Sequence, residues 1–265
     1  MLIDTHSHLY LEHFKEDIDD VINRCKVNGV EKVILPNIDS KSLVSLEKLC
    51  SSYPDVCLPA IGLHPCSVQE NWQEELVILK KHIDEQLYLG NRIYGIGEIG
   101  LDYYWDTSFK EQQHAALRTQ IKWAKALGLP IILHCRDSFD DLFDIVKELN
   151  DDNLSGIFHC FSGTLEEANK IIELGNFYVG IGGVVTFKKS QDLRDVVQEI
   201  PLEYIVIETD SPYLTPSPYR GKRNESSYVL HVAETLATVK QVGLDEIGKV
   251  TSENARKVFQ LAVNN

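Results

Sequence analysis

Histidine and carboxylate side chains recur in this sequence with spacings that suit metal binding. The set comprises His6, His8, His64, Glu98, His134, His159, Glu208 and Asp210. Burying several such groups together costs several kcal/mol per unpaired charge, and proteins usually resolve this by pairing or by metal coordination. Neutral imidazole with carboxylate suits zinc, manganese or iron, and magnesium prefers the more oxygen-rich side of a site.

The number of candidate ligands predicts more than one ion. Four histidines and two carboxylates, namely His6, His8, His134, His159, Glu98 and Asp210, exceed a single tetrahedral shell. We therefore predict two divalent ions, Mg, Mn or Zn, about 3.5 to 4 Å apart and bridged by a carboxylate. A lone strand-end histidine is more often a hydrogen-bonded core residue, so the joint pattern carries this prediction.

Eight short apolar, β-branched runs must position these residues, and amphipathic stretches separate the runs. The runs cover residues 2–9, 32–38, 56–64, 93–101, 130–136, 156–161, 177–182 and 204–209. The alternation predicts a parallel sheet covered by helices, and eight strands close into a TIM-type (β/α)₈ barrel. A doubly wound open sheet is the alternative.

The chemistry-bearing residues fall late in their runs, and in a parallel barrel these positions meet at one mouth. Residues i and i+2 of a strand face the same way, so His6 and His8 should both point into the barrel, as should Glu208 and Asp210. Residues 210–227 predict a long loop after the eighth strand, and two or three helices should close the chain from about residue 226. We expect a single domain over 1–265.

Composition restricts the partners and the compartment. The formal net charge of −14 argues against a general nucleic-acid coat protein. The six cysteines are scattered without a C-x-x-C pair, and no signal segment or membrane-length apolar run is apparent. We expect a soluble, cytoplasmic, monomeric protein that binds no membrane.

Other residues with chemical potential are assigned structural roles. His13, His82, His114 and His231 lie in helical or loop stretches and are expected at the surface. Strand alternation should turn Cys135 and Cys160 away from the barrel interior, toward the helices. Residues 95–100 have the spacing G-x-G-x-x-G, but an acidic residue lies within it and no helix follows directly, so close backbone approach explains the glycines better than dinucleotide binding does.

Several segments together resemble one family, the TatD-type metal-dependent deoxyribonucleases of the amidohydrolase superfamily. The segments are 4–8 (Asp-Thr-His-Ser-His), 62–65 (Gly-Leu-His-Pro), 97–103 (Gly-Glu-Ile-Gly-Leu-Asp-Tyr), 134–137 (His-Cys-Arg-Asp), 159–163 (His-Cys-Phe-Ser-Gly) and 208–214 (Glu-Thr-Asp-Ser-Pro-Tyr-Leu). Residues 220–225 and 252–255 also match, and Ser226 departs from an expected proline. The resemblance extends over nearly the whole chain.

The resemblance implies a division of the metal ligands. One ion would be held by His6, His8, Glu98 and Asp210, and the other by Glu98, His134 and His159. Many relatives in the superfamily bridge the ions with a carbamylated lysine, so a glutamate bridge distinguishes this branch.

Roles in catalysis follow from charge and position. Two cations would lower the pKa of a shared water and neutralise phosphodiester oxygens, with Asp210 as general base. His64 and Arg136 should line the mouth and contact the phosphate or the leaving group, although Arg136 could instead pair with Asp137 or Asp210.

Substrate-binding residues are less specifically indicated. Arg220, Lys222 and Arg223 form a basic cluster that either binds DNA ends or is a solvated loop. Glu208 is a further candidate substrate residue.

Three functions remain open at this point. The resemblance implies a deoxyribonuclease that removes nucleotides from DNA ends, most simply a 3′–5′ exonuclease on single-stranded DNA. The same two-metal site could hydrolyse a small amide, ester or lactone, because fold and metals do not choose the substrate. A non-catalytic metal-binding or assembly protein is the third reading.

Overall fold

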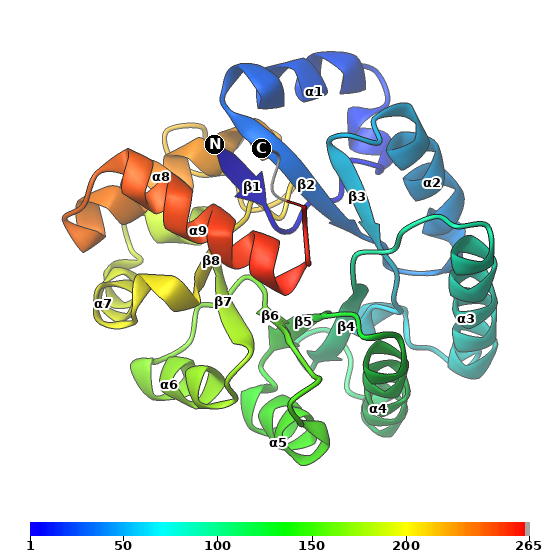
Figure 1. The fold of residues 1–265 in the computed structure, drawn as a ribbon. Helices are drawn as coiled ribbons and strands as arrows, with labels where there is room; N and C mark the ends of the chain where they lie inside the picture. Colours follow the sequence, from blue (N-terminus) through cyan, green and yellow to red (C-terminus); the bar gives the residue numbers. More distant parts are fainter. Residues whose placement is uncertain (263–265) are drawn as a thin grey trace.

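The computed structural model describes residues 1–262, and eight parallel strands form the centre of this part (Figure 1). The strands are β1 (Leu2–Asp4), β2 (Val30–Pro36), β3 (Cys57–Ala60), β4 (Ile96–Asp102), β5 (Ile131–Arg136), β6 (Gly156–Phe158), β7 (Phe177–Ile181) and β8 (Ile205–Ile207). The main helices are α1 (Ile18–Val27), α2 (Leu43–Ser52), α3 (Trp72–Tyr88), α4 (Lys110–Leu127), α5 (Phe139–Leu149), α6 (Leu165–Glu173), α7 (Gln191–Glu199), α8 (Val229–Lys240) and α9 (Leu244–Val258).

The strands form two parallel sheets, β1–β3 and β4–β8, whose order follows the chain. An isolated bridge between Ala60 and Gly95 joins β3 to the β4 side. At the other edge, Thr5 N donates to Ile207 O at 3.1 Å, next to a bridge between Ser7 and Ser211. The sheets therefore meet at both edges, and the predicted (β/α)₈ barrel is confirmed rather than the doubly wound alternative.

Several strands are shorter than predicted, because their last residues leave the regular ladder. The run 2–9 is a strand only to Asp4, and 204–209 only over Ile205–Ile207. Beyond these ends the backbone still bonds to neighbours, as when His8 N donates to Ser211 O at 2.8 Å. His6, His8, His159 and Asp210 thus lie just past the strand ends, whereas Glu98 and His134 lie within β4 and β5.

Helix α9 closes the end of the barrel at which the strands begin, and it crosses the front of the molecule in Figure 1. Its residue Asn254 donates from Nδ2 to Ile205 O at 2.7 Å and to Leu202 O at 3.0 Å. Val258 and Phe259 pack there against inward-facing residues of the strands, such as Ile132. The predicted closing helices are α8 and α9, preceded by a short 3₁₀ turn at Ser226–Tyr228. The open mouth is therefore at the opposite end.

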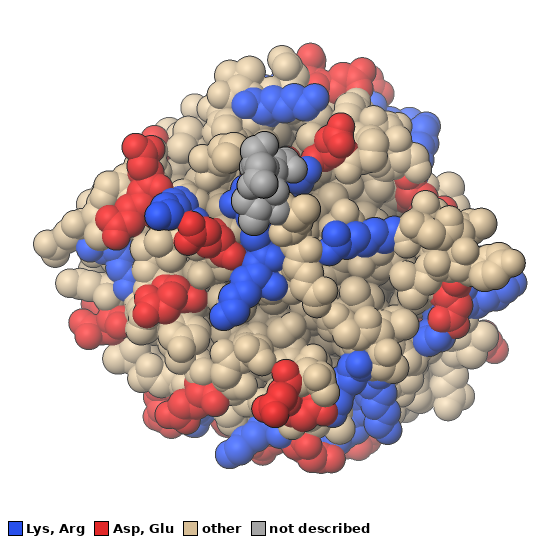
Figure 2. All heavy atoms as spheres, viewed as in Figure 1, with Lys and Arg blue, Asp and Glu red and all other residues tan. Residues whose placement is uncertain are grey.

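The face on the α9 side carries acidic and basic side chains interspersed, without a continuous basic stripe (Figure 2). Within residues 1–262, none of the helices combines the length and apolar character that a membrane crossing requires.

The glycines of residues 95–100 lie in and beside β4 and permit close strand packing, as predicted. A Cβ at Gly97 would lie 2.6 Å from Ile132 Cβ. At Gly100, where φ is +148°, a Cβ would lie 2.0 Å from the carbonyl oxygen of His134. Only glycine fits at this contact between β4 and β5.

We expect Gly100→Ala to lower the free energy of unfolding by about 3 kcal/mol or more, because the new methyl group collides with rigid backbone. Gly243→Ala is the matched control, since no atom of the described residues lies within 4 Å of a Cβ there. Urea unfolding followed by circular dichroism measures both. Equal stability of the two variants would contradict the close approach.

Candidate metal centre

Glu98 lies at the centre of the barrel mouth, and its two carboxylate oxygens face two groups of imidazoles. Oε2 lies 3.2 Å from His6 Nε2 and 3.5 Å from His8 Nε2. Oε1 lies 2.8 Å from His134 Nδ1 and 2.9 Å from His159 Nε2. A single carboxylate is thus shared between two clusters of potential ligands.

The first cluster has separations suited to one metal ion. The Nε2 atoms of His6 and His8 are 3.2 Å apart. Asp210 Oδ1 lies 3.8 Å and 3.5 Å from these two atoms. Ligands bound at zinc-like distances in a tetrahedron lie about 3.4 Å from each other, so these side chains could hold an ion without rearrangement.

Hydrogen bonds at the outer ring nitrogens indicate which histidines can offer a lone pair. His134 directs Nε2 to Asp102 Oδ2 at 2.9 Å, so Nε2 carries the proton and Nδ1 is free toward Glu98. His159 Nδ1 lies 3.3 Å from Glu208 Oε1 without hydrogen-bond geometry, and Nε2 of the same ring faces Glu98. Histidine ligands in metal sites are commonly oriented in this way.

His8 follows the same rule through a tyrosine. Tyr10 OH donates to Pro36 O at 2.8 Å and therefore accepts from His8 Nδ1 at 2.9 Å. Nε2 of His8 is then free to bind a cation. His6 Nδ1 is buried and finds no hydrogen-bond partner in the part of the chain that the structure describes.

His64 has the opposite arrangement. Its Nδ1 accepts from Cys66 N at 3.0 Å, so in the neutral ring the proton is on Nε2. That atom lies 3.3 Å from Glu98 Oε1 and 3.3 Å from His134 Nδ1. His64 is therefore close to the second cluster, but its hydrogen bonding suits a donor at the mouth better than a metal ligand.

Neighbouring charges shift the pKa values of Glu98 and His159 toward their charged forms. Burial alone would raise the pKa of Glu98, but the neighbouring His64, His159 and His6 hold that pKa well below its usual value. Burial would lower the pKa of His159, yet Glu98 and Glu208 raise it well above its usual value. Glu98 is thus ionised and ready to bind cations.

Two carboxylates behind the histidines orient them. Glu208, predicted as a substrate residue, is fully buried, and its Oε1 accepts from Cys160 N at 2.5 Å as well as facing His159. A substrate cannot reach it, so this geometry favours positioning of His159. Sequence reasoning missed Asp102 in the same role, although it lies four residues after Glu98 on one strand and so shares its face.

A buried aspartate fixes the end of β8 against β1. Asp4 Oδ1 accepts from Thr209 N at 2.9 Å, and Oδ2 accepts from Thr209 Oγ1 at 2.6 Å. Burial raises the pKa of Asp4 to about 7, although these hydrogen bonds oppose the shift. Asp210 follows directly and adopts a left-handed backbone, with φ of 54°.

The basic residues of the loop after β8 are already engaged. Arg223 donates from both terminal nitrogens to Asp17 at 2.7 Å, and Arg220 lies 3.8 Å above the Phe187 ring. Lys222 Nζ lies 5.6 Å from the centre of the Tyr219 ring. This arrangement favours attachment of the loop to α1 over phosphate binding by Arg223.

Arg136 is exposed at the end of β5. Its guanidinium carbon lies 3.7 Å from the centre of the Tyr104 ring. Within residues 1–262, this stacking replaces the alternative ion pair with Asp137 or Asp210, and Asp210 faces His8 instead.

The remaining histidines and cysteines lie outside the candidate ligand groups found in residues 1–262. His13 is exposed as predicted, whereas His82, His114 and His231 are half-buried and lie beside acidic partners. Cys135 approaches Ser138 Oγ at 3.8 Å, at the start of α5.

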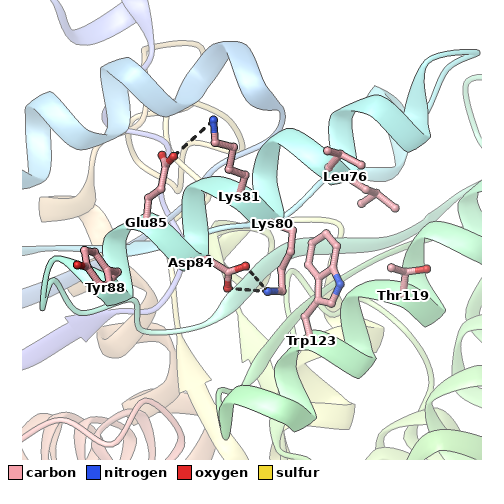
Figure 3. A pocket seen from close by; sticks show the side chains of 9 residues that line it. Leu76, Lys80, Lys81, Asp84, Glu85, Tyr88, Thr119 and Trp123 are labelled. Atoms are coloured by element: carbon pink, nitrogen blue, oxygen red, sulfur yellow. Dashed lines mark hydrogen bonds and ion pairs between the residues drawn. The ribbon is translucent and has the colours of Figure 1, made fainter.

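Two pockets differ in their relation to the centre. One of about 510 Å³ adjoins it, lined by His159 and Cys160 together with Asp137, Asp141 and Glu167. Another lies on the outside of the barrel between α3 and α4, where Lys80 pairs with Asp84 at 2.6 Å (Figure 3). The outer pocket contains none of the candidate metal ligands.

Comparison with known proteins places this centre in a family. A family model described as "TatD related DNase" matches residues 3–260. The chain belongs to this family. The E. coli K12 TatD homologue YJJV has the same fold, with a TM-score of 0.91 at 29% identity over 98% of each chain.

Curated relatives of this TatD family member carry related names. A Bacillus subtilis protein, "Uncharacterized metal-dependent hydrolase YabD", is 41% identical over 98% of this chain and 100% of its own length. Yersinia pseudotuberculosis "3'-5' ssDNA/RNA exonuclease TatD" is 32% identical over 94% of this chain and 95% of its own length. The predictions of a TatD-type protein and of a metal-dependent hydrolase are confirmed, while the number and identity of the ions stay predictions.

We expect the wild-type chain to bind two divalent ions and Glu98→Gln to weaken binding at both positions, because each oxygen of Glu98 faces one cluster. Metal analysis after equilibrium dialysis against Mn²⁺ or Zn²⁺ gives the stoichiometry. Glu166→Gln is the control, as its side chain is 80% exposed on α6. Loss of only one ion in Glu98→Gln would show that Glu98 does not bridge.

We expect Arg223→Ala to lower the free energy of unfolding by about 1 kcal/mol, because the loop after β8 loses its link to Asp17. Arg118→Ala removes a similar two-bond pair, with Glu148, on the outside of the barrel and serves for comparison. Thermal unfolding at low and high salt measures both. Wild-type stability in Arg223→Ala would instead favour a free, substrate-binding arginine.

Proposed function

We propose that this chain removes nucleotides from the ends of single-stranded DNA in the 3′–5′ direction, using two divalent metal ions. The observation that carries the proposal is the sharing of Glu98 between two clusters of imidazoles. Such paired sites are typical of enzymes that cleave phosphodiesters by in-line displacement. The name of the Yersinia relative, a 3'-5' ssDNA/RNA exonuclease, supports the polarity and the substrate.

The residues fit a division into two sites. His6, His8, Glu98 and Asp210 would hold one ion, and Glu98, His134 and His159 the other. When bound, two such cations lower the pKa of water and stabilise the anionic oxygens of a phosphodiester. Asp102 and Tyr10 accept from the outer ring nitrogens of His134 and His8, which turns the inner nitrogens toward the centre, and Glu208 lies 3.3 Å from the outer nitrogen of His159.

Asp210 is the general base in this proposal. Its side chain is 16% exposed, whereas that of Glu98 is 3% exposed, so Asp210 is the carboxylate that reaches an incoming water. Burial would raise the pKa of Asp210, but His8, His159 and His6 lower it. The ionised Oδ1 can therefore accept the proton of the attacking water.

His64 and Arg136 act on the substrate from the mouth. The Nε2 proton of His64 lies at the edge of the second cluster, where it can donate to an oxygen of the phosphate or the leaving group. No hydrogen bond or ion pair from residues 1–262 engages the guanidinium edge of Arg136, whose face rests on Tyr104, and this edge suits bidentate contact with phosphate. Arg220 and Arg223 are engaged elsewhere in the loop.

Hydrolysis of a small amide, ester or lactone is the second candidate, favoured by one observation. The pocket beside the centre is lined by Asp137, Asp141 and Glu167, which would repel a polyanion. The chain as a whole also has a formal net charge of −14. A neutral substrate would enter this pocket more readily than a DNA strand would.

We expect stepwise shortening of a 5′-labelled single-stranded oligonucleotide with Mg²⁺ or Mn²⁺, none with chelator, and a loss of about 10²- to 10⁴-fold in kcat for Asp210→Asn. Glu166→Gln is the control, since its side chain is 80% exposed on α6 and lies outside the lining of the pocket. Denaturing gels resolve the products. A metal-loaded protein that leaves DNA intact but turns over lactones would refute the nuclease.

A further inference from the structure

Two exposed aromatic rings and an arginine gather beside the metal centre. Tyr104 is 54% exposed and Trp105 is 71% exposed, directly after β4. Their ring centres are 4.8 Å apart at an interplanar angle of 89°. The guanidinium carbon of Arg136 lies 3.7 Å from the first ring centre and 5.3 Å from the second. We call these three residues the aromatic platform.

The platform is tied to the metal centre by one carboxylate. Asp102 Oδ1 accepts from Tyr104 N at 3.0 Å, while Oδ2 of the same side chain accepts from His134 Nε2 at 2.9 Å. On the neighbouring strand, Tyr103 N donates to Arg136 O at 3.0 Å. The strand ends that supply Glu98 and His134 therefore also position the platform.

Packing of the hydrophobic core does not explain why the aromatic platform lies at the surface. Tyr103, the preceding residue, is anchored inward, where its hydroxyl group donates to Asp141 at 2.8 Å. The rings of Tyr104 and Trp105 turn outward and leave most of their surface in water. Their exposed surface therefore contributes nothing to the stability of the hydrophobic core. Beside a hydrolytic centre, such rings are suited to contact with a substrate.

We propose that Tyr104, Trp105 and Arg136 bind an unpaired nucleobase of the substrate next to the bond that is cleaved. This inference rests on the proposed nuclease function and specifies its substrate. Aromatic faces stack on every base, so binding should tolerate sequence but require a base free of a duplex. Arg136 would stack through its face and hold the adjacent phosphate through its edge.

Because the chain carries a net negative charge, its affinity for DNA should come from stacking of bases on aromatic rings. The formal net charge is −14, so long-range attraction of DNA is absent. Two arginines near the loop after β8 are paired with acids, Arg223 with Asp17 and Arg24 with Glu225, at 2.7 Å. A substrate would therefore gain affinity mainly from the rings, and binding should depend only weakly on salt.

The test combines Trp105→Ala with removal of the base from the substrate. We expect Trp105→Ala to raise KM for a dT oligonucleotide about tenfold, and an abasic residue at the end to raise KM of the wild type by a similar factor. In Trp105→Ala the abasic residue should have no further effect, because the two changes remove the same contact. Trp105→Phe should restore most of the wild-type KM.

Tyr88→Ala is the matched control, because Tyr88 is 91% exposed in the outer pocket between α3 and α4 (Figure 3). Its KM should equal that of the wild type. An unchanged KM in Trp105→Ala, or effects of the variant and the abasic residue that multiply, would overturn the platform while leaving the nuclease in place.

A binding measurement separates the platform from catalysis. In Asp210→Asn, which should not cleave, thymidine monophosphate should quench tryptophan fluorescence and deoxyribose 5-phosphate should not. Adding Trp105→Phe should abolish the quenching, leaving only Trp72 and Trp123 as emitters. If the wild type cleaves no DNA but quenching is found, the platform stands and the proposed nuclease fails. Absence of quenching overturns the platform.

Discussion

The structure depends on one buried carboxylate shared between two sets of imidazoles. Glu98 is 2% exposed, and an isolated charge at that depth would cost several kcal/mol. His6 and His8 approach one oxygen, and His134 and His159 approach the other. These contacts compensate the charge, so the mouth of the barrel can hold ionised groups that a packed interior would exclude.

Keeping Glu98 in this position requires support from the backbone on both sides. Its N–H group donates to Asn37 O at 3.1 Å, which connects β4 to the end of β2. Gly97 and Gly100 allow β5 to approach so closely that no side chain would fit. Local stability and the geometry of the centre are therefore coupled, since a change that separates β4 from β5 also separates Glu98 from His134.

Some arginines of this chain stabilise the fold by pairing with acids, whereas Arg136 is accessible beside the metal centre. Arg223 and Asp17 link the loop after β8 to the segment before α1. Arg223 therefore has a structural role in the loop. Arg136, at the end of β5, is exposed and stacked on the ring of Tyr104. A protein with a formal net charge of −14 thus places an accessible guanidinium group close to the site where an anionic substrate would react.

Residue types and their periodicity were enough to predict the barrel and the convergence of His6, Glu98 and Asp210, because parallel strands bring their ends to one mouth. The strand ends were overestimated, since only neighbouring strands decide where a ladder stops. Whether Arg223 is free, and which nitrogen of His64 carries the proton, depends on contacts between residues far apart in sequence. Periodicity fixes which face a side chain occupies, whereas its hydrogen-bond partner is decided only when distant segments pack together.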